Sequence, residues 1–148
     1  MSKLVLIIYR FALKLHDLHI PLLPGVIKVF IRIVFGCQIG LGAKIGKGSS
    51  LGYGGLGIVI HHRTIIGNNV LIAQNVTIGG TSKQYDVPVI GDNCLIGPGA
   101  KILGPISIGN NCVIGANSVV TKDVSDNTLV GGIPAKVLKD DIDINKYT

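Results

Sequence analysis

The stretch Ile90-Gly-Asp-Asn-Cys-Leu-Ile-Gly-Pro-Gly-Ala-Lys-Ile102 carries the pattern that decides the fold, because an aliphatic residue returns at every sixth position and is usually followed by Gly. A period of six matches neither an α-helix, with about 3.6 residues per turn, nor a flat strand, with a period of two. Hexapeptide repeats are typical of a parallel β-helix, in which each coil stacks on the previous one. The same spacing recurs along the chain at Ile39, Ile45, Ile66, Ile96, Ile108 and Ile114.

The repeat is interrupted at two places. Twelve residues separate Ile78 from Ile90, so one hexapeptide carries a six-residue insertion, which we place within Thr81–Val87. A second interval measures nine residues and falls within Gly52–Val59. Departures from a regular solenoid are where loops and function collect. We therefore expect the functional site at these two segments.

Composition sets limits on the class of protein. The chain has 148 residues, 47% apolar but only 5% aromatic, which suits one domain whose core is built from stacked aliphatic side chains. The net charge of +6 favours an anionic ligand, whereas scattered basic residues and no nucleic-acid motif argue against nucleic acid as a partner. Three cysteines without secretory spacing indicate a reducing, cytoplasmic compartment. Cys94 and Cys112, one coil of eighteen residues apart, are expected to stack inside the coil as small apolar residues rather than form a disulfide or metal pair.

The chain divides into three segments. Residues 1–36 carry apolar residues at helical spacing, with Pro21 and Pro24 ending a first helix and a second helix running from about Val26 to Phe35. Residues 37–138 form the β-helix, and residues 139–148 form a polar tail, either a short docked helix or a frayed end. Two interpretations of residues 1–36 stay open: a helical cap over the end of the coil stack, or a basic amphipathic segment in weak contact with a membrane surface, peripheral to its inner face. Neither helix is long enough to span a bilayer.

The best candidate for chemistry is the pair His61 and His62. Adding one coil of eighteen residues places these side chains against Gly79 and Gly80, directly before the insertion. Histidine is suited to accept a proton near neutral pH. Because consecutive strand residues face opposite ways, we expect only one of the two to face the site, and we favour His61, with His62 as the alternative. Surface histidines beside a turn are the competing interpretation.

Possible helpers lie in the two irregular segments and beside them. Asp86 is expected to orient the histidine if the loop folds back, and Tyr53, Gln74 and Tyr85 are candidates to contact the substrate. A metal site is not expected, because adjacent histidines do not both reach one ion easily and no third ligand has suitable spacing.

These motifs together resemble the serine acetyltransferase branch of the hexapeptide acyltransferases. The resemblance covers about residues 39–138 and includes Gln74-Asn-Val-Thr-Ile-Gly-Gly-Thr81, Ile96-Gly-Pro-Gly-Ala-Lys-Ile-Leu-Gly104 and Gly131-Gly-Ile-Pro-Ala-Lys-Val137. It implies an all-β, left-handed parallel β-helix, a homotrimer with active sites between subunits, and acetyl-CoA as the donor. It also implies a cofactor contact surface and phosphate-binding lysines, at Gly80, Thr81, Gly99, Ala100, Lys101, Ala116, Lys122 and Lys136.

The chain departs from that branch at its catalytic histidines. Serine acetyltransferases carry Asp-His just after the position of Leu51, where this chain has Gly52-Tyr53, and a loop His before a Pro, where this chain has Val87. They also carry a longer helical segment before the coils. The short form resembles relatives that acetylate sugars in surface polysaccharide pathways.

The sequence therefore predicts an acetyl-CoA-dependent O-acetyltransferase, an acyltransferase acting on a hydroxyl of a sugar or saccharide precursor with a His base and no metal. The first alternative is serine as the acceptor. Alternatives of another class are a carbonic anhydrase-like β-helix metalloprotein and a non-catalytic β-helix.

Overall fold

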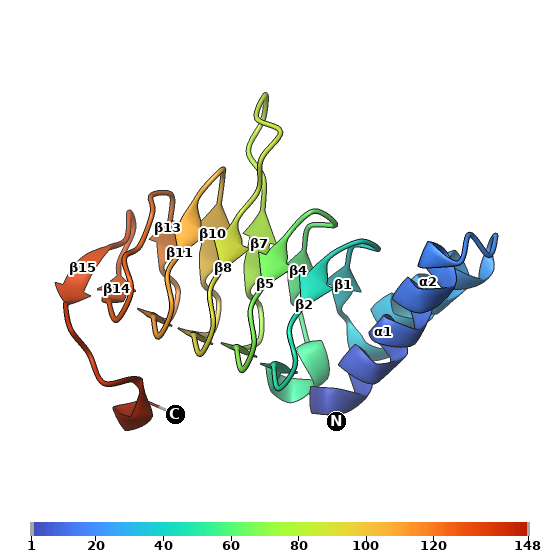
Figure 1. The fold of residues 1–148 in the computed structure, drawn as a ribbon, viewed down its shortest axis with the longest axis horizontal. Helices are drawn as coiled ribbons and strands as arrows, with labels where there is room; N and C mark the ends of the chain where they lie inside the picture. Colours follow the sequence, from blue (N-terminus) through green and yellow to red (C-terminus); the bar gives the residue numbers. More distant parts are fainter. Residues whose placement is uncertain (1, 148) are drawn as a thin grey trace.

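The structure is a computed structural model that describes residues 2–147, with side chains from Lys3 onward. Two helices, α1 (Ser2–Asp17) and α2 (Leu23–Phe35), lie at one end of a stack of short coils (Figure 1). Each coil contributes two- to four-residue strands, and the fold is a parallel β-solenoid as the repeat predicts. The strands are β1 (Gln38–Ile39), β2 (Lys44–Ile45), β3 (Ser50–Leu51), β4 (Val59–Ile60), β5 (Ile65–Ile66), β6 (Leu71–Ile72), β7 (Thr77–Gly79), β8 (Val89–Ile90), β9 (Leu95–Ile96), β10 (Lys101–Leu103), β11 (Ser107–Ile108), β12 (Val113–Ile114), β13 (Val119–Val120), β14 (Leu129–Gly131) and β15 (Lys136–Lys139).

The strands form three sheets, one along each side of the stack. Their orders are β1-β4-β7-β10-β13, β11-β8-β5-β2 and β15-β14-β12-β9-β6-β3, and every pair is parallel except β14 with β15. Neighbouring strands come from successive coils, so a residue lies beside its equivalent one coil later. The segments between sheets make three columns of turns, which we call corners.

Stacked aliphatic side chains fill the interior. Gly46 shows why glycine follows many of them, since a Cβ there would lie 2.4 Å from the carbonyl oxygen of Gly67 in the next coil. Cys94 and Cys112 are buried free thiols at equivalent positions of successive coils, which confirms their expected packing role. The three columns of inward residues are Ile39, Ile60, Ile78, Ile102 and Val120; Ile45, Ile66, Ile90, Ile108 and Val124; and Leu51, Ile72, Ile96, Ile114 and Val130.

Both expected interruptions of the repeat are confirmed. The β1–β4 register is offset by 21 residues, because a 3₁₀ turn at Gly52–Gly55 adds three residues to the coil. The β5–β8 register is offset by 24, because residues 80–88 form a loop that projects from the stack (Figure 1). A third irregularity was not predicted: Ile108 pairs with Val124, an offset of 16, so the last coil is two residues shorter than the others.

One corner is held together by asparagine side chains. We call residues 67–70, 91–94, 109–112 and 125–128 the asparagine corner. Its outer residues form a ladder in which each amide nitrogen donates to the next amide oxygen, at distances of 2.9–3.2 Å, through Asn69, Asn93, Asn111 and Asn127. All four have positive φ, which asparagine tolerates better than most residues. The ladder therefore supplies hydrogen bonds between coils where the strands end.

The helices pack over the first coil. Tyr9 of α1 is fully buried, and its hydroxyl lies 2.9 Å from the Gly40 carbonyl oxygen and 2.8 Å from that of Ala43. Arg10 Nη2 donates to the Gly46 carbonyl oxygen at 2.8 Å. These contacts close the end of the hydrophobic interior that the first coil would otherwise expose to water.

Two details at the termini differ from the sequence-based expectation. Pro24 does not end the first helix; it lies in the first turn of α2, where its missing N–H has no intrahelical partner to lose. The tail is docked, because the Ile142 N–H donates to the Asn127 carbonyl oxygen at 2.9 Å and a short 3₁₀ turn follows at Ile144–Lys146. In the part of the chain described, neither helix has the length and apolar character needed to cross a bilayer.

Candidate functional site

The histidine pair lies just beyond the end of β4, in what we call the loop corner (residues 61–64, 79–88 and 104–106). The His61 N–H donates to the Ile78 carbonyl oxygen at 2.9 Å, which sets His61 beside Gly79 in the next coil. A Cβ on Gly79 would meet no atom within 4 Å, so the space beside His61 is open. A Cβ on Gly80 would lie 3.2 Å from Val87 Cγ1, so the loop itself fills the second half of the expected space.

The two imidazole rings lie against each other. Their centroids are 4.3 Å apart with an interplanar angle of 31°. Strand alternation does not separate the two side chains, because β4 ends at Ile60 and the alternation does not extend into the corner.

The hydrogen bonding of His61 fixes which of its two ring nitrogens carries the proton. His61 Nδ1 accepts from the Arg63 backbone N–H at 3.2 Å. The pKa of His61 is lowered, first by burial and then by the neighbouring His62 and Arg63, which favours the neutral ring. A neutral ring whose Nδ1 accepts carries its proton on Nε2, so His61 has no free lone pair in this arrangement. The His62 ring has no hydrogen-bond partner among the described residues.

The projecting loop folds back onto Arg63, the residue after the histidine pair. Arg63 Nη2 donates to the Tyr85 carbonyl oxygen, and its guanidinium carbon lies 4.0 Å from the centroid of the Tyr85 ring. A pocket of about 320 Å³ lies here and includes Asp86 and Val87 in its lining. Asp86 makes no ion pair or hydrogen bond with either histidine in the described part of the chain. No contact therefore supports its expected role of orienting the histidine. Sequence reasoning missed Arg63, although this residue directly follows the histidines and lies at the same corner as the loop, one coil earlier.

Some of the expected substrate and cofactor contacts fall on a different corner. We call residues 52–58, 73–76, 97–100 and 115–118 the glycine corner. Three candidates stack there, because each lies two residues beyond a paired strand residue: Tyr53, Gln74 and Ala116. Gly99 is next to this column, and its N–H donates to the Gln74 carbonyl oxygen at 2.9 Å. Ala100 is fully buried with its N–H and carbonyl both bonded to backbone, which leaves it no group for a ligand.

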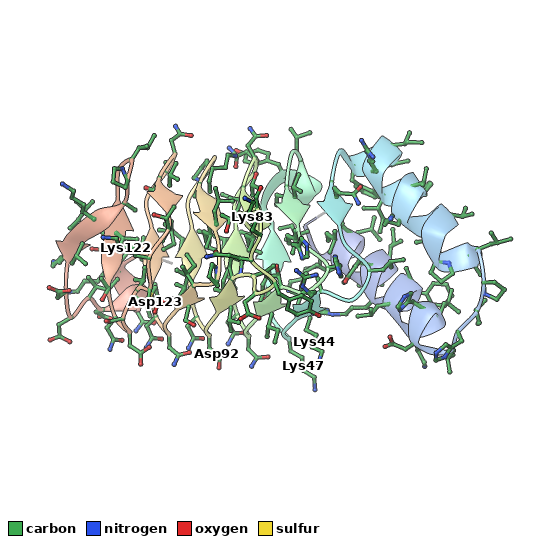
Figure 2. All side chains as sticks on the ribbon, turned by 90° about the horizontal axis from the view of Figure 1, so that it is seen from above. Lys44, Lys47, Lys83, Asp92, Lys122 and Asp123 are labelled. Carbon is green, nitrogen blue, oxygen red and sulfur yellow. The ribbon has the colours of Figure 1, made fainter. Side chains whose placement is uncertain are left out.

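The three candidate phosphate-binding lysines are not brought together. Lys122 and Lys136 line one pocket of about 290 Å³ at the last coil, together with Asp123. In Figure 2, Lys122 and Asp123 lie toward the C-terminal end of the stack, while Lys83 of the projecting loop lies near its middle. Lys101 Nζ instead donates to the Asn75 carbonyl oxygen at 2.6 Å.

The remaining candidate contacts lie at the root of the loop. Thr81 follows Gly80, and its hydroxyl lies 2.8 Å from Gln84 Oε1. Among the described residues, no three His, Cys, Asp or Glu side chains lie close enough to hold a metal ion.

Comparisons with known proteins agree on one group of relatives. The bacterial transferase hexapeptide family (six repeats) matches residues 88–122. A serine acetyltransferase of Synechococcus elongatus is 40% identical over 135 residues, which are 90% of this chain and 55% of that protein. The structure of a serine acetyltransferase of Neisseria gonorrhoeae aligns with a TM-score of 0.88 at 35% identity, over 94% of this chain and 54% of that one. A soybean serine acetyltransferase aligns with a TM-score of 0.86 at 39% identity, over 91% and 56%.

The match concerns one part of those relatives, since this chain spans about half of their length. Because the alignments reach nine-tenths of this chain, they include most of the solenoid and part of the helical segment before the coils. The chain therefore carries the bacterial transferase hexapeptide repeat and is similar, over most of its length, to the serine acetyltransferase branch of the hexapeptide-repeat acyltransferases.

Proposed function

We propose that this chain acts as an acetyl-CoA-dependent O-acetyltransferase with serine as its acceptor. The observation that carries the proposal is the alignment of the whole coil stack with serine acetyltransferases, one of them solved in complex with CoA and another with serine. The relatives support serine over the sugar acceptor expected from the sequence. A sugar hydroxyl is the second candidate, because Gly52-Tyr53 and Val87 stand where the resemblance places the catalytic Asp-His and loop His.

In this proposal His62 is the general base, and His61 positions it through the contact between their rings. His62 is preferred because Nδ1 of His61 is already occupied by the Arg63 N–H. The acceptor hydroxyl gives its proton to His62 while its oxygen attacks the thioester carbonyl of acetyl-CoA. The carbon–sulfur bond then breaks, and the CoA thiolate takes the proton back. Backbone N–H groups of the glycine-rich turns stabilise the oxyanion.

The proposed cofactor path runs along the glycine corner to the lysine pocket. Gly99 and Ala116 offer a side without large side chains, and Lys122 and Lys136 offer positive charge for phosphates. This path and the histidine pair occupy different corners of the coil stack. A homotrimer, in which a corner of one copy meets the next copy, would bring them together, and its mass should be three times the 15.5 kDa of the chain.

The test follows CoA thiol release with serine and with activated sugars. A positioned general base contributes about 10²–10⁴-fold, so His62→Ala should lower kcat/KM by that order while the oligomer mass stays unchanged. His61→Ala should cause a smaller loss, because its ring no longer lies beside His62 and no longer positions it. His16→Ala, an exposed histidine of α1, is the matched control.

Four results would overturn parts of the proposal. Wild-type turnover in His62→Ala removes His62 as the base. Release with sugars but not with serine reverses the order of the two acceptors. Calorimetric binding of acetyl-CoA without turnover on any acceptor favours the non-catalytic alternative, and stoichiometric zinc in the purified protein favours the metalloprotein.

A further inference from the structure

The second helix exposes an apolar stripe on the side away from its buried residues. Phe30 and Ile33 are 49% and 77% exposed, although both are large hydrophobic side chains. The exposed positions repeat every three or four residues, so they share one face of the helix. They are Val26, Val29, Phe30, Ile33 and Val34. Pro24 and Ile31, on the opposite side, are buried.

The first helix has the same two-sided character. Its inner residues, such as Tyr9, pack on the first coil, while Leu4, Ile7 and Phe11 are about half exposed. Beside α2, Leu22, Val26 and Val29 join Leu41 of the first coil in lining an apolar groove of about 600 Å³. An exposed apolar surface of this extent at one end of a molecule marks a binding surface.

Basic side chains lie on both helices, and Lys28 lines the apolar groove itself. Residues 3–36 hold five of the 14 Lys and Arg residues but one of the eight carboxylates, Asp17. Among the described residues Asp17 pairs only with His16, at 3.5 Å, and no carboxylate neutralises Lys28 or Arg32. Both helices therefore present apolar side chains together with uncompensated positive charge.

We propose that the outer faces of α1 and α2 dock on an anionic lipid surface. An amphipathic helix with a basic flank lies in the bilayer interface with its apolar face among the acyl chains. The helices would then serve two purposes, since their inner faces close the coil stack and their outer faces hold the protein at the membrane. Neither function requires the helices to move.

Charge decides between a lipid surface and a second copy of this chain. A contact between two copies through these helices would bring their uncompensated Lys and Arg side chains close to like charges, which opposes association. Lysine is also depleted in the cores of protein interfaces. An anionic bilayer instead attracts each of these cations, by about 1 kcal/mol per basic residue near the surface, or roughly fivefold in binding.

The proposal is tested by sedimentation of the full chain with vesicles of phosphatidylcholine alone and of phosphatidylcholine with phosphatidylglycerol. We expect the protein to pellet with the anionic vesicles at low salt and to be released as salt screens the charges. The double variant Lys28→Gln/Arg32→Gln should weaken binding by more than about tenfold. The double variant Phe30→Ser/Ile33→Gln should weaken it at every salt concentration.

Matched controls come from the far end of the stack. Lys139→Gln/Lys146→Gln removes the same charge, and Leu138→Gln removes an exposed leucine from β15, so neither should change the pelleted fraction by more than about twofold. The proposal is wrong if the protein stays in the supernatant at low salt, or if the control variants weaken binding as much as the α2 variants. It is also wrong if Phe30→Ser/Ile33→Gln lowers the oligomer mass, since a second copy then covers this face.

Discussion

At the residue scale, Asn111 shows how a single side chain joins two coils. It accepts from Asn93 Nδ2 at 3.2 Å and donates to Asn127 Oδ1 at 2.9 Å, with φ of 57°. Both Asn111→Ala and Asn111→Gly lose these bonds, but only alanine also has a cost of about 1–2 kcal/mol for the left-handed backbone. We expect the alanine variant to be less stable than the glycine variant by about 1 kcal/mol in urea unfolding. Equal stabilities would mean that the backbone of this corner relaxes.

At the element scale, the projecting loop is an insertion whose length equals one hexapeptide. Deleting the six exposed residues 81–86 should return the β7–β8 connection to the regular repeat, because the register before and after the loop is otherwise continuous. We expect an unchanged circular dichroism spectrum and oligomer mass. The proposed acetyl transfer should be lost with the deletion, because the contacts between Arg63 and Tyr85 that close the loop corner are removed. Unfolding of this variant would show that the loop stabilises the coils.

At the scale of the whole molecule, stability should fall in alkaline solution because buried acids lie where the helices meet the coils. Burial raises the pKa of Cys37 to about 12, and it raises that of Tyr9 as well. A folded-state pKa above the unfolded one stabilises the fold below the unfolded pKa, near 9 for this thiol, and that stability is lost as the pH rises toward 12. The unfolding free energy should therefore drop by up to about 1.4 kcal/mol per pH unit from Cys37 alone.

The measurement is urea unfolding at several pH values above neutrality. Cys37→Ala should flatten the alkaline slope relative to the wild type, whatever its effect on stability near pH 7. An identical slope in both proteins would mean that Cys37 ionises in the folded state as easily as in the unfolded chain.

Sequence reasoning predicted the regular part of this molecule well, because the inward aliphatic residue recurs once per hexapeptide and so marks the position of each strand in the stack. The spacing from Ile78 to Ile90 located the loop, and the stacking of His61 beside Gly79 followed from the coil length. The short last coil escaped detection, since Val124 carries no following glycine to mark it.

The site was less predictable than the fold. Strand alternation does not apply in a corner, so the contact between the His61 and His62 rings could not be foreseen. The direction in which the loop folds depends on Arg63 and Tyr85, which are far apart in sequence and belong to no repeat. The pattern Gly-Asn-Asn or Gly-Asp-Asn recurs in successive coils, but the asparagine ladder that it forms is evident only from the stacked geometry.

The antiparallel strand β15 has a consequence for how many molecules can join end to end. A stack of parallel coils offers unpaired backbone groups at its last rung, which is a template for fibre growth. Here β15 pairs with the outermost parallel strand β14 in the reverse direction, so an incoming coil finds no matching register in that sheet. At the opposite end, α1 and α2 occupy the surface on which another coil would stack. The helices and β15 therefore oppose growth of the solenoid along its axis.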